Sequence, residues 1–330
     1  MQSTERVALQ RKLFPEGIPR LWCPTLTHFS APRVPDEQQI HQHLARLAPF
    51  VKGILVPGST GEGWEMSDED VRILLNIVLP AAHEVGIQVL IGVLKTSVDQ
   101  VLATFDALRS FREHPAFVGF TVCPPKGADL PQDAIVNALQ IVLSQGYPTA
   151  LYQLPQVTSN EMTPETVATL ASEFSNFILF KDTSGNDRVA TSKLDFHDVF
   201  LVRGSESGGY AKWPKVAGGA YDGFLLSTAN VFAPELVHML ELLDKGRIEE
   251  AKRLSDRLES VVTAAFSMVK DVSMGNAFSN ANKLLYHIRT HGTKSQGFPP
   301  PMLYAGERLP EELVARAQKL LSDWSTNEIE

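Results

Sequence analysis

The chain has 330 residues, of which 44% are hydrophobic and 21% are charged, and its formal net charge is −8 at pH 7. This composition is that of a globular protein with a sizeable core, and an acidic balance without a basic run argues against a nucleic-acid or anionic-membrane partner. Two cysteines, no apolar run of membrane-spanning length and no signal-peptide pattern lead us to expect a soluble cytoplasmic protein in a reducing compartment.

Eight short apolar runs in the first 230 residues are predicted to be β-strands, and most are followed by a stretch with helical spacing. Ser67 with Asp70 three residues later resembles a capping box and predicts the start of one of these helices. The predicted strands are 20–27, 51–57, 88–94, 117–122, 149–155, 177–181, 199–204 and 222–227. Eight parallel strands with helical crossovers predict a (β/α)8 TIM barrel. The rival fold is a doubly wound open sheet, but its dinucleotide fingerprint is missing after the first strand.

The ends of the chain differ from this alternating part. Residues 1–17 are polar and mixed, and we expect a frayed N-terminal extension before the barrel of residues 18–233. Residues 234–330 show helical patterns over 234–244, 247–270 and 276–291 and again from Pro310, without strand signals. We therefore predict additional C-terminal helices packed on the barrel instead of an independent domain.

Lys181 is the first candidate for chemistry. It follows the apolar run 177–180, and the turn residues 182–186 come directly after it, so it is placed at the C-terminal end of a buried strand. A lysine kept away from water there has a lowered pKa and can attack a ketone to form a Schiff base. The alternative is a lysine that marks the exposed end of a strand.

Two further segments carry candidate groups at strand ends. The loop Gly58-Ser59-Thr60-Gly61-Glu62 offers hydroxyls and backbone N–H groups suited to a carboxylate or phosphate, or it is a structural turn. Tyr152, near the end of the fifth predicted strand, has a phenol able to relay protons, or it packs in the core. The nine histidines show no metal-ligand spacing, so no metal site is predicted.

Taken together, the three segments resemble the dihydrodipicolinate synthase / N-acetylneuraminate lyase family. The shared features are the Gly58–Glu62 loop, Tyr152 with Pro155 three residues later, and Lys181-Asp182-Thr183-Ser184-Gly185-Asn186. The resemblance implies a class I aldolase that needs no cofactor and assembles as a homotetramer. It also implies that Lys181 forms an imine with pyruvate or another 2-oxo acid.

The same resemblance assigns roles to individual residues. It implies that Lys181, Tyr152 and Thr60 are catalytic, with Tyr152 as the proton relay, and that Ser59 and Thr60 hold the substrate carboxylate. The further substrate-binding candidates are Gly61, Thr183, Gly204, Glu206, Leu225 and Ser227. Cations near the predicted barrel mouth that could meet a distal carboxylate or hydroxyl are Lys95, Lys126, Arg188 and Arg203, and the alternative for each is a solvated surface charge.

Departures from the synthase branch of the family indicate a different substrate. Val157 stands where that branch has an arginine for the second substrate, and Cys123-Pro124-Pro125-Lys126 replaces a tyrosine pair. We expect a Schiff-base lyase for retro-aldol cleavage or dehydration of a sugar-acid-like or aromatic substrate. The alternatives are 4-hydroxy-tetrahydrodipicolinate synthase in lysine biosynthesis and a non-catalytic protein that binds a 2-oxo acid.

Overall fold

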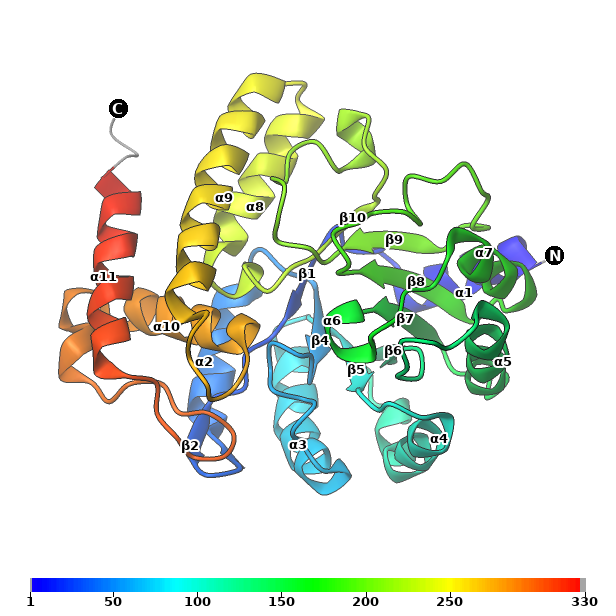
Figure 1. Ribbon diagram of the computed structural model, residues 1–330, viewed down its shortest axis with the longest axis horizontal. Coiled ribbons are helices and arrows are strands. Elements are labelled where there is room, and N and C mark those ends of the chain that lie inside the picture. Colours follow the sequence, from blue (N-terminus) through cyan, green and yellow to red (C-terminus); the bar gives the residue numbers. More distant parts are fainter. Residues whose placement is uncertain (1, 327–330) are drawn as a thin grey trace.

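Eight parallel strands close into a barrel in the computed structural model, which describes residues 2–326 (Figure 1). Their order around the barrel is β1-β10-β9-β8-β7-β6-β5-β4, and β1 pairs with both β4 and β10. This closure confirms the predicted TIM barrel and excludes an open doubly wound sheet. The strands are β1 (Leu21–Pro24), β4 (Gly53–Val56), β5 (Gln88–Val93), β6 (Phe117–Val122), β7 (Thr149–Gln153), β8 (Phe177–Asp182), β9 (Phe200–Arg203) and β10 (Gly223–Leu225).

Alternation along each strand separates the barrel interior from the layer under the helices. Inward residues such as Trp22, Leu55 and Leu179 form one apolar cluster that fills the barrel, whereas neighbours such as Ile54 and Phe180 pack against the surrounding helices. The two sets together explain why the strands read as continuous apolar runs in the sequence.

The helices around the barrel are α2 (Glu37–Leu47), α3 (Asp68–Glu84), α4 (Val98–Ala107), α5 (Gln132–Leu143), α6 (Pro155–Thr158) and α7 (Pro164–Glu173), with the 3₁₀ helix η1 (Arg109–Glu113). The capping box predicted for α3 is present, with the Ser67 Oγ accepting from the Asp70 N–H at 3.2 Å. Two features were not expected: a hairpin of β2 (Phe29–Ala31) and β3 (Val34–Pro35), and a connection from β9 to β10 that holds the 3₁₀ helix η2 (Lys215–Ala217).

The expectation of a frayed N-terminus is wrong, because residues Gln2–Leu13 form helix α1, which contacts β8 and α7. The Arg6 guanidinium is fully buried and donates to the carbonyl oxygens of Ala171 at 2.5 Å, Phe174 at 2.7 Å, Phe177 at 2.7 Å and also His197. Gln10 donates to two further carbonyls. Polar side chains that look solvated in the sequence thus satisfy backbone oxygens at the N-terminal end of the barrel.

Replacing Arg6 with methionine should lower the free energy of unfolding by about 3 kcal/mol, because several buried carbonyl oxygens lose their donor at once. Urea denaturation would measure this. Arg11→Met is the matched control, since Arg11 lies exposed on the same helix, and it should change the free energy by less than about 0.5 kcal/mol. Equal stability of the two variants would contradict a role for α1 in closing the barrel.

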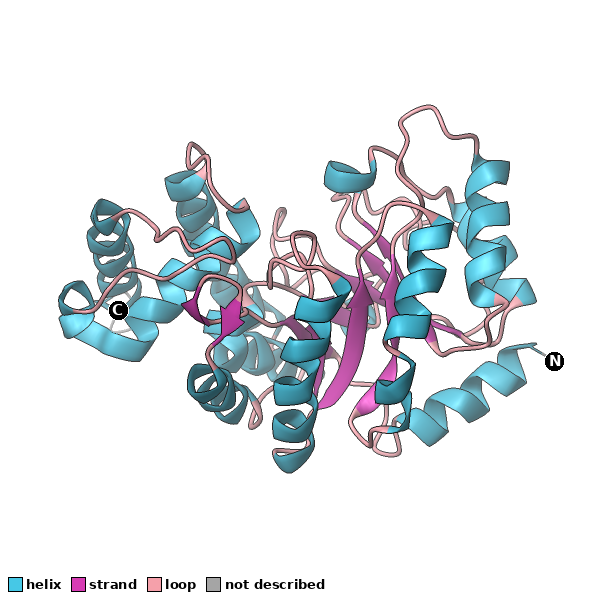
Figure 2. Ribbon diagram, turned by 90° about the horizontal axis from the view of Figure 1, so that it is seen from below, coloured by secondary structure: helices cyan, strands magenta, loops and turns pink. Residues whose placement is uncertain are grey.

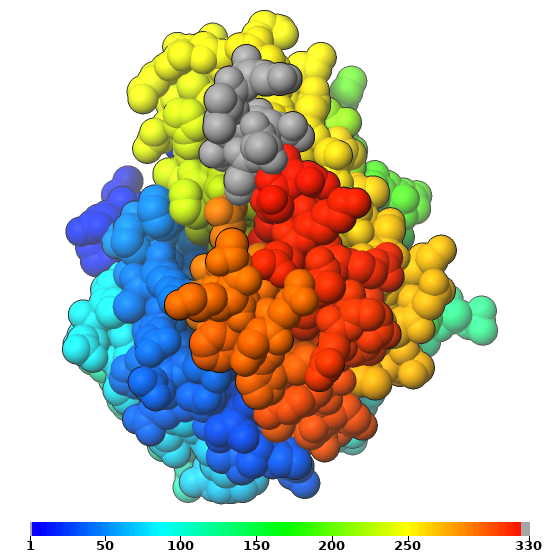
Figure 3. Space-filling model, turned by 90° about the vertical axis from the view of Figure 1, so that its left-hand side faces the viewer, coloured from blue at the N-terminus to red at the C-terminus, as the bar shows by residue number. Residues whose placement is uncertain are grey.

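The C-terminal part of the chain is helical and lies at the opposite end of the molecule from α1 (Figure 1, Figure 2). Its elements are α8 (Ala229–Asp244), α9 (Ile248–Val269), α10 (Ala277–His291), the 3₁₀ helix η3 (Gly292–Gly297) and α11 (Glu311–Thr326). One continuous apolar cluster runs from these helices to α2, α3 and the outer face of β1. In Figure 3 the C-terminal segments, drawn in orange and red, lie against the N-terminal segments drawn in blue.

The domain boundary at residue 233 stays a prediction. Helix α8 runs across it and is kinked at Phe232, two residues before Pro234. Among the helices within residues 2–326, none has the length and apolar content that a bilayer crossing requires.

Candidate active site

The side chains of Lys181 and Tyr152 lie side by side at the C-terminal ends of β8 and β7. The two residues are register partners, and the Lys181 Nζ is 3.9 Å from the centre of the Tyr152 ring. Both are buried, with 4% and 2% of their surface exposed. This edge of a TIM barrel is the one at which active sites form.

Burial controls the protonation of both groups. Removal from water lowers the pKa of Lys181 to about 7, although the nearby Cys123, Glu206 and Cys23 act in the opposite direction. A substantial fraction of the amine is therefore neutral and nucleophilic at neutral pH. Burial raises the pKa of Tyr152, so its phenol stays protonated, and it raises the pKa of the Cys123 thiol to about 12.

The glycine-rich loop reaches the same place. The hydroxyls of Ser59 and Thr183 lie beside the Tyr152 phenol and oppose the rise of its pKa. Ser59 and Thr60 are both buried, and Ser59 Oγ accepts from the Trp64 indole N–H at 2.9 Å. Within residues 2–326, neither the Ser59 nor the Thr60 backbone N–H donates to a protein acceptor, so both are free for an anion. The three segments singled out in the sequence thus converge on one site.

Space around the lysine depends on Gly204. A Cβ at this position would lie 2.8 Å from the Lys181 Cε and 2.7 Å from the Thr183 Oγ1, closer than side chains tolerate. The Thr183 hydroxyl is buried and has no well-formed hydrogen bond within the described chain. A buried hydroxyl beside the lysine that forms no well-formed hydrogen bond is a group that a substrate oxygen could satisfy.

A buried ion pair that the sequence did not reveal holds the glycine-rich loop in place. The Glu62 carboxylate contacts the Lys283 ammonium of α10, and it also accepts from the Tyr304 backbone N–H at 3.0 Å. Asn276, at the start of α10, donates to the Ser59 carbonyl oxygen at 3.1 Å. The C-terminal helices therefore help to position the residues proposed to bind the carboxylate.

Arg203 is neither the substrate-binding cation nor the solvated surface charge that the sequence left open. Its side chain is 1% exposed and forms two hydrogen bonds of 2.8 and 3.0 Å with the Asp187 carboxylate. It also stacks on Trp213 at 4.0 Å, and Tyr221 donates to Asp187 at 2.7 Å. This network, which sequence reasoning missed, supports the ends of β8 and β9 and gives Arg203 a structural role.

Other candidates at the barrel mouth also have protein partners. The Lys95 ammonium is 2.8 Å from the Asp68 carboxylate. The Glu206 carboxylate accepts from the Ser227, Thr228 and Tyr210 side chains and from the Thr228 N–H. Leu225 packs in the barrel interior with Trp22, whereas Lys126 and Arg188 are exposed.

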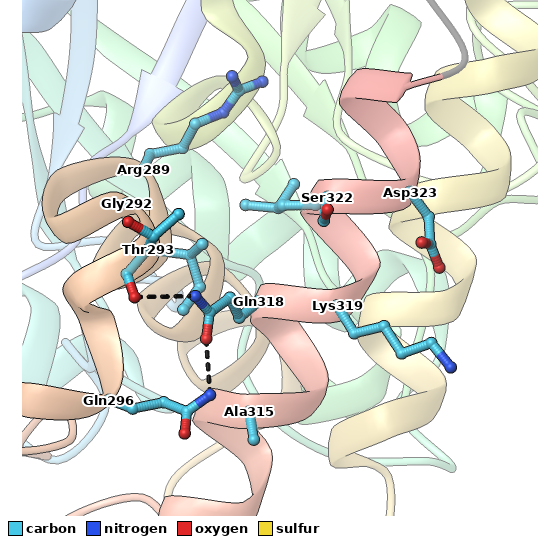
Figure 4. Close-up of a pocket in the computed structure, with 11 residues that line it drawn as sticks. Arg289, Gly292, Thr293, Gln296, Ala315, Gln318, Lys319, Ser322 and Asp323 are labelled. Atoms are coloured by element: carbon cyan, nitrogen blue, oxygen red, sulfur yellow. Dashed lines mark hydrogen bonds between the residues drawn. The ribbon is translucent and has the colours of Figure 1, made fainter.

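No three His, Cys, Asp or Glu side chains among residues 2–326 form a group that could hold a metal ion. A cavity of about 620 Å³ lies elsewhere, between α10, η3 and α11 (Figure 4). It is lined by residues such as Thr293, Gln296 and Gln318, and the candidate catalytic residues are not among them. The cavity is therefore separate from the candidate site at Lys181.

The closed parallel barrel places the chain in the class of (β/α)8 TIM-barrel proteins, with a buried lysine, a buried tyrosine and a glycine-rich turn at the C-terminal edge of the barrel. Comparison with known families agrees. Residues 36–279 match the model of the dihydrodipicolinate synthetase family, and the chain belongs to this family. A relative from Methanopyrus kandleri, named 4-hydroxy-tetrahydrodipicolinate synthase, is 26% identical over 290 residues, covering 86% of this chain and 90% of that protein.

Solved structures show the same fold. YagE, described as a prophage protein of the dihydrodipicolinic acid synthase family from E. coli K12 in complex with pyruvate, aligns with a TM-score of 0.72 at 20% identity, covering 92% of this chain and 98% of that one. The 2-keto-3-deoxygluconate aldolase of Sulfolobus, in complex with D-KDPG, aligns with a TM-score of 0.69 at 19% identity over 94% and 98%. These likenesses concern the fold.

Proposed function

We propose that the protein is a lyase that forms a Schiff base between Lys181 and a 2-oxo acid such as pyruvate, and that it cleaves or dehydrates a larger 2-oxo acid. The observation that carries this proposal is the position of the Lys181 amine, with a pKa of about 7, against the Tyr152 ring. Family membership supports lyase or aldolase chemistry in general terms.

The arrangement supports a sequence of proton and bond movements. The substrate carboxylate binds the Ser59 and Thr60 backbone N–H groups, which places the ketone carbon beside Lys181. The neutral amine adds to this carbon, and the protonated Tyr152 phenol donates to the developing oxyanion, so that water can leave and an iminium forms. The iminium then accepts the electron pair of a breaking C–C bond, or the pair of the C3–H bond when the C3 proton is removed. No bound metal or organic cofactor is needed for these steps.

Borohydride reduction in the presence of pyruvate tests the shared step. The expected result is a mass gain of one reduced pyruvate unit on the Lys181 peptide, and none in the Lys181→Ala variant. Labelling of Lys95 or Lys283 instead would show that the site assignment is wrong. Pyruvate binding without an adduct would favour a non-catalytic binding protein.

Synthesis of 4-hydroxy-tetrahydrodipicolinate is a second candidate, because it is the activity named for the Methanopyrus relative. Val157 argues against this synthase activity, since an apolar side chain offers no positive charge to the carboxylate of a second substrate. Efficient turnover of aspartate semialdehyde with pyruvate would establish this candidate. We further propose a cytoplasmic homotetramer, as the family resemblance implies.

A further inference from the structure

We infer that the substrate carries an apolar group, aliphatic or aromatic, beyond its reacting carbons, so that cleavage releases pyruvate and an apolar aldehyde. This inference rests on the proposed function, because it names the substrate class of the same site. It excludes a sugar acid and a dicarboxylic acid as the preferred substrate. It rests on the contacts at the C-terminal ends of β5, β6, β7 and β8, and on the ion pairs that the nearby charged side chains form.

A row of side chains crosses the barrel at the level of the lysine. Val93 pairs with Val122, Val122 with Leu151, and Tyr152 with Lys181, so the next residues, Leu94 and Cys123, continue the row of Tyr152 and Lys181. Leu94 and Cys123 contact Tyr152 in one buried apolar cluster, and they are 5% and 2% exposed. The side chains that lie beyond Tyr152, on the side away from Lys181, are therefore apolar.

The same cluster extends outward toward the barrel mouth. Leu154 belongs to it, and Trp64 and Val157 pack against it while remaining partly exposed. Trp64 also connects the cluster to the proposed carboxylate site, because its indole N–H donates to the Ser59 Oγ. A substrate held by Ser59 and Lys181 would thus have its remaining carbons near an aromatic ring and aliphatic side chains.

Charged groups around this surface are already neutralised or in water. Lys95 is paired with Asp68, Arg203 with Asp187, and Lys126 is exposed. A distal carboxylate placed against Trp64, Leu154 and Val157 would lose hydration without gaining a buried cation, which is costly. An apolar group would instead gain free energy from burial.

Hydroxyl recognition is also limited on the opposite side of the mouth. The Glu206 carboxylate receives four hydrogen bonds from the protein, one of them from Ser227, and Ser205 is bonded to Ser207. The buried Thr183 hydroxyl lies beside the Tyr152 phenol and forms no well-formed hydrogen bond, so it can bind one substrate oxygen, such as the C4 hydroxyl. A polyol chain has several hydroxyls, and each buried one needs a partner.

Cleavage of such a substrate would proceed through an imine on Lys181. A 4-hydroxy-2-oxo acid condenses through its C2 carbonyl with the Lys181 amine, and one water leaves. The Tyr152 phenolate, left after the phenol donates its proton during imine formation, accepts the C4 hydroxyl proton. The C3–C4 electron pair moves to the iminium nitrogen, so that an apolar aldehyde departs and an enamine remains. The enamine takes a proton at C3, and water hydrolyses the resulting iminium to pyruvate and free Lys181.

Three substrates that share the pyruvate half test the inference. They are 4-hydroxy-2-oxo-4-phenylbutanoate, 4-hydroxy-2-oxoglutarate and 2-keto-3-deoxygluconate, and pyruvate release is followed with a coupled dehydrogenase. We expect kcat/KM for the phenyl compound to exceed both others at least tenfold. An equal or higher value for either other compound overturns the inference.

A variant series links the result to the apolar surface. Val157→Arg should lower kcat/KM for the phenyl compound and raise it for 4-hydroxy-2-oxoglutarate, whereas Val157→Leu should keep the wild-type order. Val157 is partly exposed, so an arginine can be accommodated there. Borohydride trapping with pyruvate alone separates the two proposals: no adduct on Lys181 overturns the proposed function, whereas an adduct with the wrong substrate order overturns this inference alone.

Discussion

We expect the Lys181→Met variant to form no pyruvate adduct and yet to resist unfolding better than the wild type at pH 6. The variant loses the nucleophile, so activity should fall to background. It also removes an amine whose burial disfavours its charged form. Methionine has a similar length and no charge, and it can fill the space between Tyr152 and Gly204.

The gain in stability should depend on pH in a defined direction. The pKa of Lys181 is about 7 in the folded chain against a usual value of 10.5. Below pH 7 both states hold the proton, and the folded wild type bears the full cost of a buried charge. Between pH 7 and pH 10.5 the unfolded chain binds more protons than the folded chain, so the free energy of unfolding of the wild type rises with pH. The advantage of the variant, at most about 5 kcal/mol for this difference in pKa, should therefore shrink toward pH 10.5.

Urea denaturation at several pH values measures this effect. Lys12→Met, at an exposed lysine on α1, is the control and should show no comparable pH-dependent advantage. An advantage of Lys181→Met that stays constant with pH would assign the effect to packing and not to charge.

The second large effect is expected at the Glu62–Lys283 ion pair. Lys283→Met should lower the free energy of unfolding by about 3 to 5 kcal/mol, because it leaves a buried carboxylate without its counter-ion. The loop that carries Ser59 and Thr60 should also lose its fixed position, so that half-maximal borohydride trapping needs roughly tenfold more pyruvate. Denaturation and titration of the adduct measure the two effects.

Two controls separate the charge effect from simple disruption. The double variant Glu62→Gln/Lys283→Met removes both charges and should recover much of the stability. Arg247→Met breaks an exposed ion pair with Glu250 and should leave the free energy of unfolding close to that of the wild type, because solvent screens exposed charges. A single Lys283→Met variant as stable as Arg247→Met would contradict the anchoring role of the pair.

Much of the barrel could be predicted because its strands are short, buried and separated by turn residues. All eight predicted strands are present within two or three residues of their expected bounds. Helix α1 was missed because its buried residues, Arg6 and Gln10, are polar and satisfy backbone oxygens from distant segments. Polar side chains with such partners leave no hydrophobic periodicity to detect.

Some residues of the candidate site could likewise be predicted from the sequence, and others could not. Lys181, Tyr152 and Ser59 each occur at a strand end within a readable local pattern, and parallel strands bring such ends to one edge. Lys283 gave no such signal, because every residue of α10 from Ser279 to Ile288 is buried and its one ammonium contacts Glu62, far away in sequence. The role of Arg203 could not be decided from the sequence, because only its contact with Asp187 distinguishes a structural cation from a binding or solvated one.

Local patterns of burial and turns in the sequence were enough to predict the barrel, its strand ends and the residues that meet at the candidate site. Contacts between distant segments were needed to see which charged side chains are neutralised, that the C-terminal helices anchor the loop around Ser59, and that a buried apolar cluster surrounds Tyr152. Pairing, burial and pKa depend on which groups from distant segments meet in space, and a linear pattern does not contain that information.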